Sequence, residues 1–397
     1  MPKCLDVNSW RAATREELLD YYGPGEKKRK GGSALIIRSQ IKPVDAYAYL
    51  RARFGQPNGF QNFLRKDDSD NLIHWDFNLK AHDADVYLSA TSRTIHVQLS
   101  EKMTDEEWQD FILAWRADFQ RIGPEKSAMI RSFEKYYVFQ NKFKSLADEC
   151  ALMHEAIIDE PELELQLPTS NPDDAVWAEM EKKLKAHGER ATGLFSDCLK
   201  LRLMMPVMAE AYINMVIITF CKDVIRNDRV QYETFVRAKI PERIDLLTQH
   251  CSGFVQRIDT KSILYRDFLR VMNLRNFALH GNVDPVREQI ETVYFEGRRP
   301  LFGQSGDHHL RFFEHLEQMH KPQEVIRDYE AVHNFLHEIA SCLSEQHQKF
   351  FEQIIGDPFP GYDVHRRRVT RILPNQIMSA YFPGLRYDDE LAVDWKS

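Results

Sequence analysis

The residues best suited to chemistry lie in one nonapeptide, residues 274–282, which reads Leu-Arg-Asn-Phe-Ala-Leu-His-Gly-Asn. Arg275 offers a planar fork of hydrogen-bond donors that fits phosphate oxygens, and His280 carries an imidazole that titrates near neutral pH. Asn276 could orient either group. These residue types suit cleavage of a phosphodiester bond without a metal ion, because the imidazole can move protons while the guanidinium stabilises the developing charge.

A helix is expected to position this motif. Apolar residues recur at steps of three and four from Ile263 to Leu279, so Arg275 should lie on or beside the apolar face. Gly281 follows the last periodic residue and is expected to end the helix, which places His280 in the final turn. The five steps between the two side chains turn them ~140° apart on a straight helix. They converge only if the last turn frays or a partner surface completes the site.

The spacing of Arg275 and His280, with the polar Asn276 directly after the arginine, resembles the Arg-x4-6-His motif of the HEPN superfamily. The apolar segment 208–220, with the acidic Glu210 near its start, resembles the first core helix of such a bundle. The resemblance implies a helical bundle that acts as a metal-independent RNase. It also implies that the Arg-Asn pair and the histidine are catalytic, that Glu210 supports them, and that no cofactor is needed.

The same resemblance covers about residues 194–346 and has implications for partners. RNases of this superfamily usually bring two motifs together across a two-fold axis, so it implies a homodimer that cleaves single-stranded or loop RNA. It further implies a toxin or an anti-phage effector, controlled by an antitoxin or by a trigger. One departure is Asn282, because members silenced by a nucleotidyltransferase carry a tyrosine at that position.

Simpler interpretations of the same residues stay open. Arg275 could pair with a buried acid such as Glu210, and His280 could only cap its own helix. Arg266 and Arg270, four residues apart on the same helix, could extend a phosphate track for RNA binding or form salt bridges with nearby acids. The bundle could also be a catalytically silent dimerisation or scaffold module, or the chain a nucleic-acid-binding regulator.

Length and composition predict a two-domain globular protein. The chain has 397 residues, of which 43% are hydrophobic and 11% aromatic, with a net charge of −7 and a pI near 6.1. This charge argues against a broad basic surface, so any nucleic-acid site must be local. Two basic clusters, at 27–30 and at 365–368 with Arg371, are either solvated loops or such local sites.

Neither a membrane nor an oxidising compartment is indicated. No apolar run approaches the ~18 residues that span a bilayer, and the first residues lack a signal-peptide pattern, so a cytoplasmic location is expected. The six cysteines are scattered without a Cys-x2-Cys pair, which favours reduced core thiols.

Two further sets of residues have alternative roles. His333 and His337 are four residues apart, but no third ligand stands at a known metal spacing, so no metal site is predicted. Three methionines at the start of the apolar helix could line a dimer interface or pack in the core: Met204, Met205 and Met208.

Five segments are expected along the chain. An N-terminal tail covers 1–32, and an α+β domain with the order β-α-β-β-β-α covers 33–154, with one antiparallel sheet and helices on one face. An acidic, proline-broken linker covers 155–174, an all-α HEPN-like bundle 175–356, and a C-terminal extension 357–397. The α+β domain would recognise a trigger, a partner or the substrate.

The expected elements follow the periodicity of apolar residues. In the α+β domain, Thr104 should cap the second helix with a capping box, and a further helix should lead out over 127–154. The expected strands are 34–37, 73–79, 85–90 and 94–99, and the helices 43–54 and 106–122. The expected bundle helices are 175–185, 194–227, 241–249, 262–280 and 323–346, with 284–321 as a projecting insert.

Overall fold

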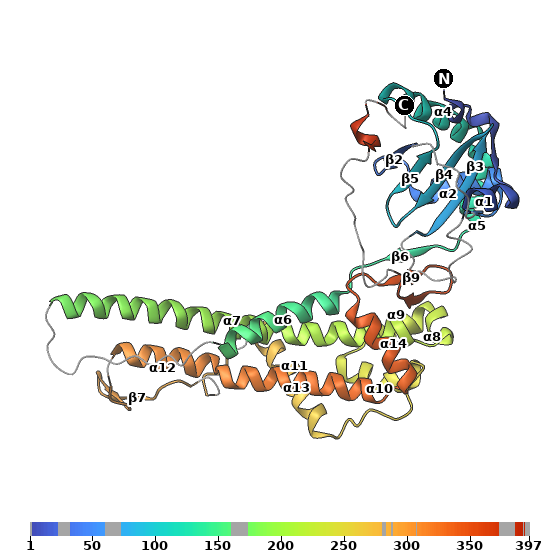
Figure 1. Ribbon diagram of the computed structural model, residues 1–397. Coiled ribbons are helices and arrows are strands. Elements are labelled where there is room, and N and C mark those ends of the chain that lie inside the picture. Colours follow the sequence, from blue (N-terminus) through green and yellow to red (C-terminus); the bar gives the residue numbers. More distant parts are fainter. Residues whose placement is uncertain are drawn as a thin grey trace. The chain divides into compact units, whose positions relative to one another are not determined.

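The computed structural model in Figure 1 divides into two compact units, residues 1–136 with 372–397, and residues 137–371. The first unit contains a sheet and the second is mainly helical, which confirms the expected sheet-containing N-terminal region and helical C-terminal region. The structure describes residues 2–22, 32–59, 73–159, 174–279, 283–286, 289–306, 308–372, 386–391 and 393.

The N-terminal unit is built on a six-stranded sheet with the order β1-β3-β4-β5-β2-β11. Neighbouring strands are antiparallel, except that β11 runs parallel to β2. Strands β2 to β5 lie where the alternating sequence predicts them. The strands are β1 (Trp10–Ala12), β2 (Ser33–Ile37), β3 (Trp75–Ala81), β4 (Ala84–Ala90), β5 (Ile95–Leu99) and β11 (Arg386–Tyr387).

Two helices, α2 (Pro43–Phe54) and α4 (Asp105–Arg121), form one core with the alternate apolar residues of this sheet. Tyr49 of α2 and Trp115 of α4 are fully buried in it. Thr104 caps α4 with the predicted capping box, because its hydroxyl accepts the backbone N–H three residues on. The unit also contains α1 (Arg15–Tyr22) and α5 (Gly123–Ser132).

Both chain ends depart from the expected tail and extension. Cys4 and Trp10 are buried in the core, and β1 pairs with β3, so the first residues are part of the fold. Residues 357–371 belong to the helical unit, whereas β11 completes the sheet of the first unit. There, the Asp388 carboxylate accepts the backbone N–H of Arg38 at 2.9 Å. Strands of two or three residues are too short to show a periodic pattern, which explains why they were not predicted.

The boundary between the units also lies earlier than expected. One helix is predicted over 127–154, but the structure has α5, then β6 (Tyr136–Val138), then α6 (Lys142–Asp159). Cys150 and Ile157 of α6 are buried in the core of the helical unit. This apolar stripe assigns α6 to the second unit, and the expected linker falls inside that unit, largely outside the described residues.

The helical unit is organised around α7 (Asp174–Phe220), which packs against α6, α11 and α13. Two helices are predicted here, at 175–185 and 194–227, but α7 is one helix of 47 residues. At 1.5 Å per residue it is about 70 Å long. It ends at Phe220, and the Arg226 guanidinium donates at 3.0 Å to the carbonyl of Ile218 in its last turn and at 3.0 Å to the carbonyl of Cys221 directly after it.

The remaining helices include three that the sequence did not indicate, α9, α12 and α14. The segment expected to project as an insert contains α12 and a two-stranded hairpin, β7 (Val293–Glu296) with β8 (Arg299–Phe302). A small sheet contains β6, β9 (Gly361–Asp363) and β10 (Arg368–Thr370). The helices are α8 (Asp223–Asn227), α9 (Arg229–Arg237), α10 (Ile240–His250), α11 (Ile263–Leu279), α12 (His308–His320), α13 (Pro322–Ser341) and α14 (Glu345–Gly356).

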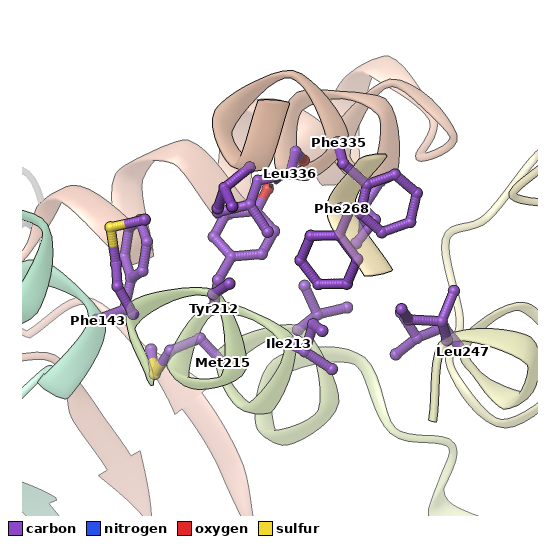
Figure 2. Close-up of a cluster of buried hydrophobic side chains, with 14 of the residues drawn as sticks. Phe143, Tyr212, Ile213, Met215, Leu247, Phe268, Phe335 and Leu336 are labelled. Atoms are coloured by element: carbon purple, nitrogen blue, oxygen red, sulfur yellow. Dashed lines mark hydrogen bonds between the residues drawn. The ribbon is translucent and has the colours of Figure 1, made fainter. Parts of the chain in front are cut away.

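Figure 2 shows how the core of this unit holds α11 in place. Phe268 of α11 packs on Phe335 of α13, with ring centroids 4.6 Å apart. Ile213 of α7 is fully buried in the same cluster. The Tyr212 hydroxyl donates to the Leu336 carbonyl at 3.1 Å, which also ties α7 to α13. The helix that carries the motif is therefore anchored by side chains from two others.

One window of α7 is long and apolar enough to cross a membrane by composition alone, contrary to the expectation that no such run exists. Within the bundle, 61% of that window is buried, as in the core helix of a globular unit. Met205 and Met208 are fully buried there and Met204 is partly buried, so these methionines pack in the core. All six cysteines are buried and free, which confirms the expected core thiols.

Candidate functional site

The motif begins in the last described turns of α11. Phe268, Val271 and Met272 bury one face of this helix in the core. Arg275 follows three residues after Met272 and is half-buried at the edge of that face, whereas Asn276 is exposed. The guanidinium therefore lies at the border between core and solvent, where the lowered dielectric strengthens its interactions with a negative charge.

Arg275 has few partners of its own. Its Nη1 donates a hydrogen bond to the Asn276 Oδ1 at 3.0 Å. Its Nε is buried and meets no acceptor among the described residues, and no described acid forms an ion pair with it. A buried donor without an acceptor costs free energy, so an anion that reached this guanidinium would gain a hydrogen bond that α11 does not supply.

The rest of the motif, His280, Gly281 and Asn282, lies outside the described residues. The backbone of α11 is described as far as Leu279, directly before the histidine. The approach of His280 to Arg275, and the end of the helix at Gly281, therefore remain predictions.

Glu210 does not pair with Arg275. Its Oε1 instead forms a hydrogen-bonded ion pair with the Nη2 of Arg243 in α10. Arg243 is only 7% exposed and also donates from Nη1 to the Asn214 Oδ1 and from Nε to the Ala238 carbonyl, both at 2.8 Å. Because Arg243 occupies this carboxylate, the interpretation that Glu210 neutralises Arg275 is wrong. The observed contacts of Glu210 tie α10 to α7.

The two arginines upstream of the motif differ. The Nη2 of Arg270 forms an ion pair at 2.6 Å with Asp328 of α13, whose side chain is 4% exposed. Loss of this partner would leave a buried charge, so Arg270 holds α11 against α13, as the salt-bridge alternative predicts. Arg266 is exposed and pairs with no acid in the described part of the chain. It remains a candidate for contact with RNA.

His333 lies in a stack of rings at the α6–α13 interface. The Tyr329 ring is 4.4 Å from His333 and 4.3 Å from His154, measured between centroids. Burial, with a smaller contribution from His154, lowers the pKa of His333. His337 is exposed one turn later, and no three potential metal ligands gather within the described ranges.

The C-terminal basic cluster is engaged within the helical unit. Arg368 forms an ion pair with Asp223 of α8 at 2.8 Å, and Arg366 with Asp363 at 3.6 Å. These contacts hold β9 and β10 and favour a structural role for the cluster over binding to nucleic acid. The N-terminal cluster at 27–30 lies outside the described residues.

The N-terminal unit carries a cavity that the sequence did not indicate. Its volume is about 430 Å³, and residues of α2, α4 and α5 line it. Arg116 and Lys126 contribute positive charge, and Lys126 lies 4.0 Å from the Asp45 carboxylate and 5.2 Å from the centroid of Phe119. Charged groups beside an aromatic wall are a common lining of small-ligand sites.

Comparison with known proteins assigns the chain to no family. No protein-family model, no curated protein and no solved structure matches the chain. The candidate site therefore rests on the Arg275–Asn276 geometry and on the resemblance of the motif, whose histidine directly follows the last residue of α11 in the sequence.

Proposed function

We propose that the helical unit is a HEPN-like bundle and that the chain is a metal-independent endoribonuclease acting on single-stranded or loop RNA. Arg275, Asn276 and His280 are its proposed catalytic site. The observation that carries the proposal is the state of Arg275. It is half-buried, oriented by Asn276 and left without an acid partner among the described residues, five positions before the histidine of the motif in the sequence.

The chemistry assigns one task to each residue. His280, as a general base, takes the proton from the ribose 2′-hydroxyl, whose oxygen attacks the adjacent phosphorus. The bond from phosphorus to the 5′-oxygen breaks, and the imidazolium of His280 passes the proton that it took to that leaving oxygen. Arg275 stabilises the extra negative charge on the phosphorane oxygens. The products are a 2′,3′-cyclic phosphate and a free 5′-hydroxyl.

Asn276 acts as a positioning residue for the guanidinium. By accepting from Nη1 at 3.0 Å, its amide oxygen fixes one edge of the planar fork. The Nη2 donors then remain for the substrate phosphate. Such preorganisation matters because a donor that is already oriented costs little reorganisation when charge develops.

A homodimer completes the proposed site. A single straight helix turns Arg275 and His280 ~140° apart, whereas a second copy can bring its own motif to the same phosphate across a two-fold axis. Mixing inactive Arg275→Ala and His280→Ala chains should restore part of the activity if each site takes one residue from each chain. A fully active monomer in light scattering would contradict the composite site.

The biological setting that we propose is a cytoplasmic toxin or anti-phage effector whose N-terminal unit binds a trigger or an antitoxin. The cavity lined by Arg116 and Lys126 is a candidate trigger site in that unit. Expression of the chain should slow the growth of a host, and His280→Ala should remove the effect. Equal growth with both chains would contradict this setting.

The function is tested by incubating the purified full-length chain with single-stranded RNA and comparing it with His280→Ala. Cleavage should fall at least about 100-fold, because the variant loses the group that moves protons. His365→Ala, which removes an exposed histidine of the same unit, is the matched control and should cleave normally. Wild-type rates in His280→Ala would refute the assignment. Absence of cleavage by every chain would favour the silent scaffold.

A further inference from the structure

The β7–β8 hairpin exposes all of its side chains. Val293 to Glu296 pair in antiparallel register with Phe302 to Arg299, around a turn at Gly297 with a φ of 63°. All eight strand residues are exposed. Figure 1 shows the hairpin, labelled β7, beside α12. The His315 Nε2 of α12 lies 3.6 Å from the Glu291 carboxylate, two residues before the hairpin, and this contact leaves the strands uncovered.

The edge formed by β8 is closed to another strand. The Gly303 N–H donates to the Thr292 carbonyl at 3.1 Å, so these residues form a hydrogen-bonded pair. Since such pairs alternate with non-hydrogen-bonded ones, Pro300 and its partner Phe295 form a non-hydrogen-bonded pair. Their outer edges face solvent, and proline has no N–H to offer there. A further β-strand therefore meets a missing donor on this side.

The two faces of the hairpin carry uncovered aromatic rings. Phe295 and Phe302 share one face with Val293 and are 68% and 67% exposed, while Tyr294 on the other face is 63% exposed. A two-stranded ribbon is marginally stable on its own, and these rings add apolar area in contact with water. A ligand that covered them would stabilise the hairpin.

The tip of the hairpin points to the chemistry of that ligand. Arg298 and Arg299 are exposed, and neither forms an ion pair with an acid of the described chain. Guanidinium groups beside open aromatic faces match phosphates and unstacked bases. The pattern therefore favours a single-stranded nucleic acid.

We propose that the β7–β8 hairpin is a base-stacking platform that captures single-stranded RNA for cleavage by the same chain. Bases stack on Phe295 and Phe302, and Arg298 and Arg299 contact the backbone phosphates. The proposal rests on the proposed RNase function for its biological meaning. The platform is a short exposed element. This agrees with the net charge of −7, which restricts RNA binding to a local site.

Binding is measured by fluorescence anisotropy with a labelled single-stranded oligouridylate, in the full-length His280→Ala background so that the probe stays intact. The double variant Phe295→Ala/Phe302→Ala should raise the Kd about 10-fold or more, since base stacking on an aromatic ring contributes substantially to affinity. Phe295→Tyr, which keeps a stacking ring, should bind normally. Phe359→Ala, which removes a 51% exposed phenylalanine outside the hairpin, is the matched control.

The outcomes separate this proposal from the proposed function. Unchanged affinity in the double variant, or no binding by the parent chain, overturns the platform even if the wild-type chain cleaves RNA. Hairpin-dependent binding by a chain that never cleaves RNA supports the platform and refutes the RNase. A double variant that binds RNA normally but loses its dimer in light scattering would identify the hairpin as a protein interface and overturn the proposal.

Discussion

Arg243 and Arg275 lie on consecutive helices of one unit, and their surroundings are opposite. Arg243 is 7% exposed and has three partners: Glu210, Asn214 and the Ala238 carbonyl. Arg275 is half-buried and has Asn276 alone among the described residues, with its Nε unsatisfied. The difference teaches that a buried arginine whose three side-chain nitrogens each have a partner serves packing, whereas one with a nitrogen left unpaired at the edge of the core can serve a ligand.

The largest expected effect is on catalysis at Arg275. Arg275→Ala should lower the rate of RNA cleavage by about 100- to 1,000-fold, because removal of a charge-stabilising donor has that order of effect. Its melting temperature should stay within a few degrees of wild type, since no ion pair with a described acid is lost. Arg327→Ala, an exposed arginine of α13, is the control and should change neither property. If the Arg275→Ala chain cleaved RNA at the wild-type rate, Arg275 would not differ from Arg243 in serving a ligand.

The next largest effect is on stability at Arg243. Arg243→Ala leaves the partly exposed Glu210 carboxylate and the Asn214 amide without their partner, so the free energy of unfolding should fall by about 2–3 kcal/mol. Denaturant unfolding of the full chain, followed by helical circular dichroism, measures this loss. A cost under about 0.5 kcal/mol, the range of surface substitutions, would show that the Arg243 network does not stabilise the bundle.

The smallest effect extends the comparison to histidines. Burial lowers the pKa of His333 from its ordinary value of 6.5. Its neutral form is favoured in the folded state, so its contribution to stability is full above pH 6.5 and is lost as the pH falls below that value. His333→Phe should therefore lose less thermal stability than wild type between about pH 7 and 5. His337→Gln, at an exposed position, should follow wild type. If the melting temperatures of His333→Phe and of wild type fell equally over this pH range, the prediction would be wrong.

The sequence predicts the elements whose side chains repeat with a clear period. Strands β2 to β5, the Thr104 cap of α4 and the apolar face of α11 follow from local spacing. It does not predict pairings between distant residues. The contact of Arg38 with Asp388 joins positions 350 residues apart, and strands as short as β1 and β11 become visible only when the sheet forms.

In the candidate site, too, the sequence predicts local contacts but not contacts between distant residues. The order of Arg275, Asn276 and His280 suggests the chemistry, and the hydrogen bond between the first two is local. The partner of Glu210 is not local, since Arg243 is 33 residues away along the chain. Glu210 and Asn214 stand one helical turn apart and present two acceptors on one face of α7. That spacing is a sequence signal for a buried arginine.

The most direct test of the central claim is the chemistry of the RNA ends. Labelled single-stranded RNA is incubated with the wild-type chain in excess EDTA, with Arg275→Ala as the matched inactive chain, and the product ends are identified. We predict cleavage by the wild type alone, with 2′,3′-cyclic phosphate and 5′-hydroxyl ends. Loss of cleavage in EDTA that Mg²⁺ or Mn²⁺ restores, or products that end in 3′-hydroxyl groups, would contradict a metal-independent site at the end of α11.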